Sequence, residues 1–202
     1  MSIRVGIMTA AAAAGLLLFS SAPSWAKSTK HTSSGHHTSA MHADHFIKEA
    51  AMGGMAEVEL GQLAEERGSS DQVKAFGKRM VDDHTKVNDD LKTMAARKNV
   101  TLPTDLDAKN QATRDRLAKL SGDEFDRAYM SDMVKDHRED VAAFEKATKS
   151  TDSDVQAFAS KNLPTLKEHL SQARQVEQQF ASRGNMKQEG KDQGMARRGA
   201  AQ

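Results

Sequence analysis

Three histidines occupy positions where the sequence predicts the middle of an apolar helical stripe. His84, His137 and His169 each lie on a different predicted helix, among apolar residues at three- and four-residue steps. An imidazole that is directed into a helical core needs a partner there, either a hydrogen-bonding group or a metal ion. The nature of that partner decides which chemistry the protein can perform.

A carboxylate on a fourth predicted helix could join the histidines. At about 100° per residue, Glu57 lies on the apolar face of a helix expected over residues 44–67, whereas Glu59 points the other way. Three imidazoles and one carboxylate could close around a divalent ion such as zinc or iron, because nitrogen and oxygen donors at about 2 Å suit both metals. The predicted metal residues are therefore His84, His137, His169 and Glu57, and spacing leaves open whether they share one level along the helices.

Two other interpretations of the histidines remain open. In the first, no metal is bound, and each neutral ring is satisfied by a carboxylate on one nitrogen and by a backbone carbonyl or water on the other. Asp83, Asp136, Glu57 and Asp140 are the candidate carboxylates. In the second, copper binds, because Met80 and Met133 each precede a histidine by one turn and a thioether beside an imidazole suits copper. Methionine at helical spacing is more often core filler.

The elements that must position these residues are all predicted to be helices. Apolar periodicity predicts long helices over residues 44–67, 71–98, 122–150 and 152–180, and a short one over 105–120. Gly68 is expected to end the first by adopting a left-handed backbone, and Ser69 or Ser70 to cap the second. The predicted starts of the last two are a Ser-x-x-Glu capping box at residues 121–124 and a cap at Asp152 or Ser153.

The order of these helices predicts a particular bundle. Met80-Val81-Asp82-Asp83-His84 is nearly repeated as Met133-Val134-Lys135-Asp136-His137, which suggests that one helical hairpin was doubled. A link of about 20 residues with a helix of its own would let the two hairpins assemble through a crossover, as in ferritin-like bundles. The predicted fold class is all-α, a ferritin-like four-helix bundle with a short extra helix in the crossover and disordered tails.

The segments outside the predicted bundle have different compositions. Residues 1–26 resemble a signal peptide, with Arg4, an apolar run over 5–19 and a Ser24-Trp25-Ala26 cleavage site. Residues 27–43 are rich in Ser and His and residues 183–202 are basic and Gly-rich, so both are expected to be disordered around a bundle at 44–182. We therefore expect an exported protein, periplasmic or secreted, with no transmembrane span after signal cleavage.

The first of these tails carries a second group of histidines. His31, His36, His37, His42 and His45 fall within 15 residues. Such a group could capture zinc, nickel or copper loosely and with strong pH dependence, because a protonated imidazole is not a ligand. Chance enrichment in a polar tail explains the same spacing.

Composition excludes several classes of function. The chain has 29 basic and 28 acidic residues, and removal of Arg4 with the signal peptide makes the two counts equal, which argues against nucleic-acid binding. No cysteine is present, so neither a disulfide nor a thiolate nucleophile can form. No Gly-x-Ser-x-Gly or phosphate-binding glycine motif occurs. These absences favour a non-enzymatic protein and leave an oxidase or peroxide-consuming enzyme as a further alternative.

Four segments, in order, resemble a known family. Residues 46–60 (FIKEAAMGGMAEVEL), 80–86 (MVDDHTK), 121–129 (SGDEFDRAY) and 162–169 (NLPTLKEH) are similar to the ferritin-like family of exported bacterial proteins of unknown function, often labelled predicted outer-membrane proteins. The resemblance implies a ferritin-like helical fold and no particular activity. Di-iron members of the wider class have Glu-x-x-His motifs, whereas Val81, Val134 and Leu166 stand at the Glu positions here, which argues against a di-iron centre.

Two functions follow from these observations. The first is an exported ferritin-like bundle that binds zinc, iron or copper through inward histidines, in a stress or metal-handling role. The alternative is a structural or interaction module of the cell envelope that holds no metal. No nucleic-acid partner is expected for either, and protein partners stay open.

Overall fold

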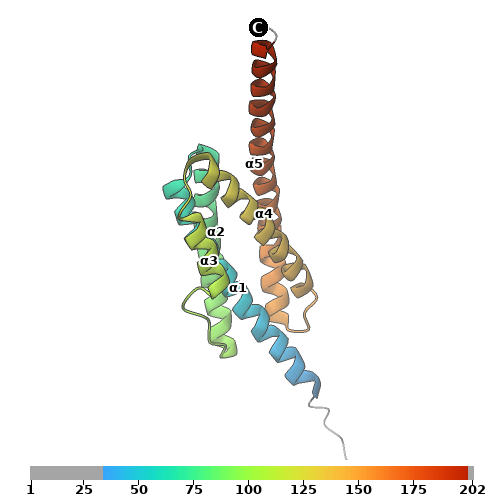
Figure 1. Ribbon diagram of the computed structural model, residues 1–202. Helices are drawn as coiled ribbons and strands as arrows, with labels where there is room; N and C mark the ends of the chain where they lie inside the picture. Colours follow the sequence, from blue (N-terminus) through green and yellow to red (C-terminus); the bar gives the residue numbers. More distant parts are fainter. Residues whose placement is uncertain (1–33, 200–202) are drawn as a thin grey trace, which may run out of the picture. The chain divides into compact units, whose positions relative to one another are not determined.

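The structure, a computed structural model, describes residues 34–199 and the side chains of residues 42–182. The chain divides into the units Met1–Thr32 and Ser33–Gln202, and all described residues belong to the second. The predicted signal peptide lies outside them. The described elements are five helices, and the described residues contain no strand, so the all-α prediction is confirmed (Figure 1): α1 Ser34–Arg67, α2 Asp71–Lys98, α3 Ala108–Leu117, α4 Gly122–Ala147 and α5 Ser153–Gly199.

The four long helices form two hairpins (Figure 1). Helix α1 packs mainly along α2, and α4 mainly along α5, while further contacts join α1 to α4 and α2 to α5. The short helix α3 lies in the crossover and contacts α1 and α4. The Asp107 N–H donates to Met52 Sδ at 3.2 Å and Arg114 donates to Glu59 Oε2 at 3.0 Å, so both ends of α3 are attached to α1. The predicted four-helix bundle with an extra crossover helix is confirmed.

Local capping groups explain where α2 and α5 begin. The Ser70 hydroxyl accepts from the Val73 N–H at 3.2 Å, and Asp152 Oδ1 accepts from the Val155 N–H at 3.2 Å, as expected at helix starts. Ser121 occupies the cap position of α4 without a side-chain capping bond, so the predicted capping box is wrong. The physical reason is Gly122, whose φ of 61° gives α4 a left-handed first residue in place of the regular first turn that a capping box needs.

The turn between α1 and α2 is held by contacts from another helix. Gly68 follows the end of α1 as predicted, but its φ is not positive. A Cβ at Gly68 would lie 2.6 Å from the Ala64 carbonyl oxygen, so close packing, and not a left-handed backbone, requires glycine there. The buried Asp126 carboxylate on α4 accepts from the Ser69 N–H at 2.9 Å, the Ser69 hydroxyl at 2.7 Å and the Ser70 N–H at 2.9 Å. These bonds tie the first hairpin to the second.

Two helices extend beyond their predicted bounds. Helix α1 begins at Ser34 and α5 ends at Gly199, and α5 remains helical across Pro164. No proline occurs in residues 34–43 or 183–199, and a helix that has already formed gains one hydrogen bond for each residue added. Ala43, in the first of these stretches, is buried in the core. The helical spans therefore reach into segments whose composition indicated tails. No described helix is both long and apolar enough to cross a membrane.

The core consists of two apolar clusters separated by polar residues. The first cluster includes Ile47, Ala51, Leu91, Phe144, Phe158 and Leu166, and the second includes Leu60, Met80, Tyr129, Met133, Ala173 and Val176. Four buried polar residues come between members of these clusters along the four long helices: Glu57 on α1, His84 on α2, His137 on α4 and His169 on α5. Each long helix thus contributes one polar residue to the boundary between the two clusters.

Candidate metal centre

The three predicted histidines meet inside the bundle. One ligand nitrogen from each of His84, His137 and His169 lies within 4.8 Å of the other two. Their ring centroids are 5.3 to 5.7 Å apart, and the residues are 3%, 0% and 1% exposed, respectively. In the described part of the chain, these residues form the one cluster of His, Cys, Asp or Glu with ligand atoms close enough to hold a metal ion.

Hydrogen bonds assign the proton on two of these rings. The His137 Nδ1 lies 3.0 Å from the Met133 carbonyl oxygen, and the His169 Nε2 lies 3.0 Å from Asp83 Oδ2. Because a carbonyl or carboxylate oxygen can only accept, the proton must be on the imidazole nitrogen in each pair. The lone pairs are then on His137 Nε2 and His169 Nδ1. Both of these nitrogens, and also His84 Nε2, are buried and have no hydrogen-bond partner among the described residues.

Burial keeps the three rings uncharged. Desolvation, followed by the neighbouring His137 and His169, holds the pKa of His84 well below its usual value. Desolvation and the nearby His169 lower the pKa of His137 to about 3, and desolvation lowers the pKa of His169 despite its hydrogen bond to Asp83. At neutral pH the cluster therefore presents uncharged imidazoles, which is the form that binds a metal.

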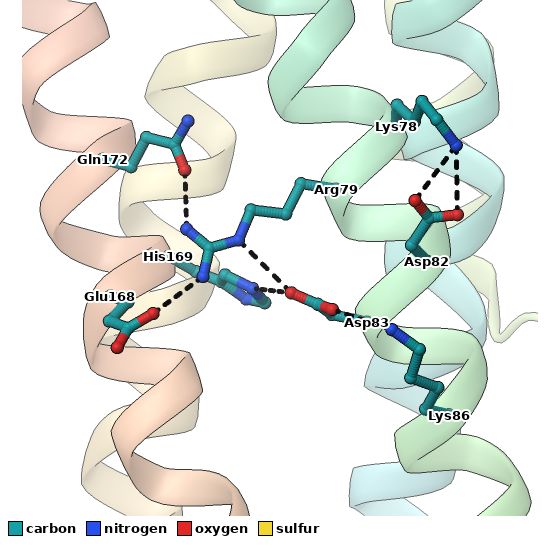
Figure 2. Close-up of polar contacts among 8 residues, drawn as sticks. All are labelled: Lys78, Arg79, Asp82, Asp83, Lys86, Glu168, His169 and Gln172. Atoms are coloured by element: carbon teal, nitrogen blue, oxygen red, sulfur yellow. Dashed lines mark hydrogen bonds and ion pairs between the residues drawn. The ribbon is translucent and has the colours of Figure 1, made fainter.

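The carboxylate that orients His169 is itself held by cations (Figure 2). Arg79 donates to Asp83 Oδ2 at 3.3 Å, to Glu168 at 2.8 Å on α5 and to Gln172 at 2.9 Å, while Lys86 lies 3.5 Å from Asp83 Oδ1. Burial raises the pKa of Asp83, but the hydrogen bonds from His169 and Arg79 outweigh it and leave that pKa lowered. Arg79 was not identified from the sequence, although its four-residue spacing from Asp83 on a helix was a usable signal.

Glu57 is buried but occupies a different place from the cluster. It is 3% exposed, and its Oε1 lies 3.7 Å from His137 Nδ1, the nitrogen already bonded to the Met133 carbonyl. Glu57 Oε2 has no hydrogen-bond partner among the described residues. Desolvation, followed by Asp140, Asp136 and Asp132, raises the pKa of Glu57 well above its usual value. The structure therefore brings together the three predicted histidines and places the predicted carboxylate on the far edge of one ring.

The other candidate ligands lie in the apolar core, on the surface or beside a pocket. Met80 and Met133 are buried in the second apolar cluster with Leu60 and Tyr129. His42 and His45 are exposed on α1, and the remaining tail histidines lie outside the residues whose side chains are described. Asp140 and Asp136 border a pocket between α1, α3 and α4 and not the imidazole cluster.

Comparison with known proteins supports the fold and supplies no activity. Residues 27–176 match a family described as "Domain of unknown function (DUF4142)". A crystal structure of a DUF305 fragment from Deinococcus radiodurans is similar in fold, with a TM-score of 0.62 at 13% identity, and the match covers 68% of this chain and 96% of that one. No curated protein matches the chain.

Proposed function

Because the chain belongs to the DUF4142 family, a family of unknown function, we propose from the geometry of its own side chains that it binds one transition-metal ion. The ligands are His84 Nε2, His137 Nε2 and His169 Nδ1. The observation that carries the proposal is the convergence of three buried histidines, which offer one nitrogen each within 4.8 Å of the other two, together with a buried, unpartnered nitrogen on every ring.

The distances are compatible with a single ion after small movements. Nitrogens bound to one tetrahedral ion at about 2 Å lie roughly 3.3 Å apart. Bringing atoms from 4.8 Å or less to that separation requires each ring to move inward by about 1 Å or less, which side-chain rotation provides. The hydrogen bonds to Met133 and Asp83 hold His137 and His169 by the nitrogen opposite the ligand, which is the usual way a protein orients metal-binding imidazoles.

The ligand type restricts the metal. Three neutral imidazoles without a thiolate suit Zn²⁺, Cu²⁺ and Fe²⁺ better than Mg²⁺ or Ca²⁺, which prefer oxygen ligands. Three protein ligands also leave a coordination position for water or a small molecule. Together with the signal-like sequence of residues 1–26, these features support a metal-handling role for an exported protein, in the periplasm or secreted.

The alternative is a structural module in which the histidines form only hydrogen bonds. The bonds from His137 to Met133 and from His169 to Asp83 agree with that alternative, because they satisfy one nitrogen on each of these two rings. It would leave three ring nitrogens buried without a partner, each at a cost of about 1–3 kcal/mol. A bound cation would satisfy all three at once, so the metal proposal accounts for more of the geometry.

The test is zinc binding in a background that lacks the tail histidines. In full-length protein with His31, His36, His37, His42 and His45 replaced by Ala, we expect Zn²⁺ to bind at one equivalent and to raise the melting temperature. Excess zinc at 100 times its Kd should add about 2.7 kcal/mol to the free energy of unfolding. A chelator should reverse the effect.

Matched variants distinguish the two functions. Two double variants are made in this background: His84→Ala with His137→Ala, and the more conservative His84→Gln with His137→Gln. Each should abolish the binding of one equivalent of Zn²⁺, and circular dichroism checks that the helices remain. The proposed centre is eliminated if zinc, iron and copper all fail to bind the background protein, or if they bind the double variants with unchanged affinity. The structural module would then remain.

A further inference from the structure

The thioether of Met52 holds the N-terminal end of the crossover helix. Met52 lies on α1, and its Sδ accepts a hydrogen bond from the Asp107 N–H at 3.2 Å. Asp107 is the N-cap residue of α3, and its Oδ1 in turn accepts from the Asn110 N–H at 2.8 Å. The residue that begins α3 is therefore bonded directly to a sulfur atom of α1.

The other attachments of α3 are weak or few. The helix has 10 residues, fewer than the roughly 12–15 that an isolated helix needs in water. Lys109 and Arg114 pair with acids on α4 and α1 that are 57% and 40% exposed, and exposed ion pairs contribute little stability. Leu106 and Leu117 are the buried apolar residues at its two ends. The position of α3 therefore depends on few contacts, and the Met52 bond is one of them.

The Met52 side chain is accessible to small solutes. It is partly exposed and lines a cavity of about 260 Å³ between α1, α3 and α4. Met55 is also partly exposed, but its Sδ accepts no hydrogen bond among the described residues. The other methionines with described side chains are at most 2% exposed: Met80, Met94, Met130 and Met133. Met52 thus combines access from solvent with a contact that positions another helix.

We propose that Met52 is a site of oxidative modification, and that its oxidation by a peroxide loosens α3 from α1. With hydrogen peroxide, an S–O bond forms and the O–O bond breaks, and the second oxygen leaves as water. The sulfur loses two electrons and the peroxide gains them, so the thioether becomes a sulfoxide. Met52 is not a ligand of the proposed histidine centre, and this inference does not rest on that centre.

Oxidation changes the group that faces the start of α3. A sulfoxide is larger and more polar than a thioether, and its oxygen extends beyond the sulfur. The Asp107 N–H now lies 3.2 Å from that sulfur, so it can meet the new oxygen only if Asp107 moves away. The present bond is therefore lost or reformed with α3 displaced, and the helix packs less firmly on α1.

The experiment is oxidation of the full-length protein by hydrogen peroxide in the presence of a chelator, followed by peptide mass spectrometry. We expect Met52 and Met55 to be oxidised at least about tenfold faster than the four buried methionines, because exposure governs the reaction. Amide hydrogen exchange in α3 should then accelerate roughly fivefold, the factor that corresponds to the loss of one hydrogen bond. Enzymatic reduction of the sulfoxide should restore the slower exchange.

Two matched variants assign the effect to Met52. In Met55→Leu, peroxide should still accelerate exchange in α3. Met52→Leu conserves side-chain volume and cannot form a sulfoxide, so exchange in α3 should be faster from the start and unchanged by peroxide. The proposal is overturned if Met52 is oxidised no faster than the buried methionines, if its oxidation leaves α3 exchange unchanged, or if peroxide accelerates that exchange equally in both variants.

Discussion

The hydrogen-bond partners of His137 and His169 determine which nitrogen of each ring is left without a partner. His137 uses Nδ1 for a backbone carbonyl four residues earlier on its own helix, so Nε2 is left for a ligand. His169 does the opposite, because Asp83 on α2 accepts from its Nε2 and leaves Nδ1. At the scale of single residues, Asp83 is therefore the side chain that orients His169 in the proposed centre (Figure 2).

Asp83→Asn should reduce zinc affinity about 10- to 100-fold, the usual effect of losing a group that orients a metal ligand. In the amide of this variant only the oxygen can accept a hydrogen bond from His169. The amide also lacks the negative charge with which Arg79 and Lys86 pair in the wild type. Competition with a chromophoric chelator measures the change. The matched control is Asp82→Asn, since the neighbouring Asp82 pairs with the exposed Lys78 and not with the cluster. Equal affinities for the two variants would contradict the role of Asp83.

Helix α1 approaches α2 closely because small residues face one another. A Cβ at Gly61 would lie 2.7 Å from the Gly77 carbonyl oxygen, and a Cβ at Gly77 would lie 2.7 Å from Ala64 Cβ. Neither contact can be relieved by rotating a flexible side chain. The separation of the two helices in the first hairpin, and with it the position of His84 in the core, depends on these glycines.

Gly61→Ala should lower the free energy of unfolding by about 1–3 kcal/mol, the usual cost of overpacking. Gly53→Ala, on the same helix, is the control, because its nearest neighbour would be Asp140 Oδ1 at 3.8 Å, an ordinary contact. There, replacing glycine inside a helix should be neutral or stabilising by up to about 1 kcal/mol. Urea unfolding of both variants gives the comparison. A Gly61→Ala protein as stable as Gly53→Ala would show that the helices can separate without cost.

In the molecule as a whole, an ionisable layer lies between the two apolar clusters of the core. Glu57, His84, His137 and His169 separate the two apolar clusters. The three rings are uncharged in the folded protein because protonation inside the core is disfavoured, whereas the same rings in the unfolded chain protonate near pH 6.5. The stability of the metal-free protein must therefore depend on pH.

Keeping His137 uncharged contributes to the free energy of unfolding. This contribution is fully present above pH 6.5 and is lost as pH falls toward the folded pKa of His137, about 3. Over that window we expect a loss of about 1.4 kcal/mol per pH unit from this ring. Asp140 acts in the opposite direction, because its folded pKa of about 7 lies above its usual pKa of 3.8. Its contribution to the free energy of unfolding is therefore present below pH 3.8 and is lost as pH rises through 7.

Urea unfolding in the presence of a chelator at several pH values between 7.5 and 5 measures both effects. His137→Gln should lose less stability on acidification than the wild type does. Asp140→Asn should lose more, because it lacks the gain that the wild type obtains when Asp140 is protonated. Identical pH slopes for the three proteins would contradict the burial of these charges.

The sequence by itself determined the helices and the inward direction of the three histidines. These features are local: apolar periodicity sets the buried face of each helix, and Ser70 and Asp152 cap helices through residues two or three positions away. The same periodicity placed Glu57 correctly on a buried face. Helix ends were less well determined, since residues 34–43 and 183–199 contain no proline that would end a helix.

Only the tertiary structure decided how these side chains meet. The level of each ring along the bundle depends on how two hairpins pack, and the free nitrogen of His169 depends on Asp83, which is 86 residues away in the chain. Contacts between helices likewise decide that Glu57 lines the pocket between α1, α3 and α4. They also show that Gly68 is required for close packing and not for a left-handed backbone. The rotamers of these side chains, and their partners on other helices, depend on how whole helices pack. Residue spacing within one helix carries no information about that packing.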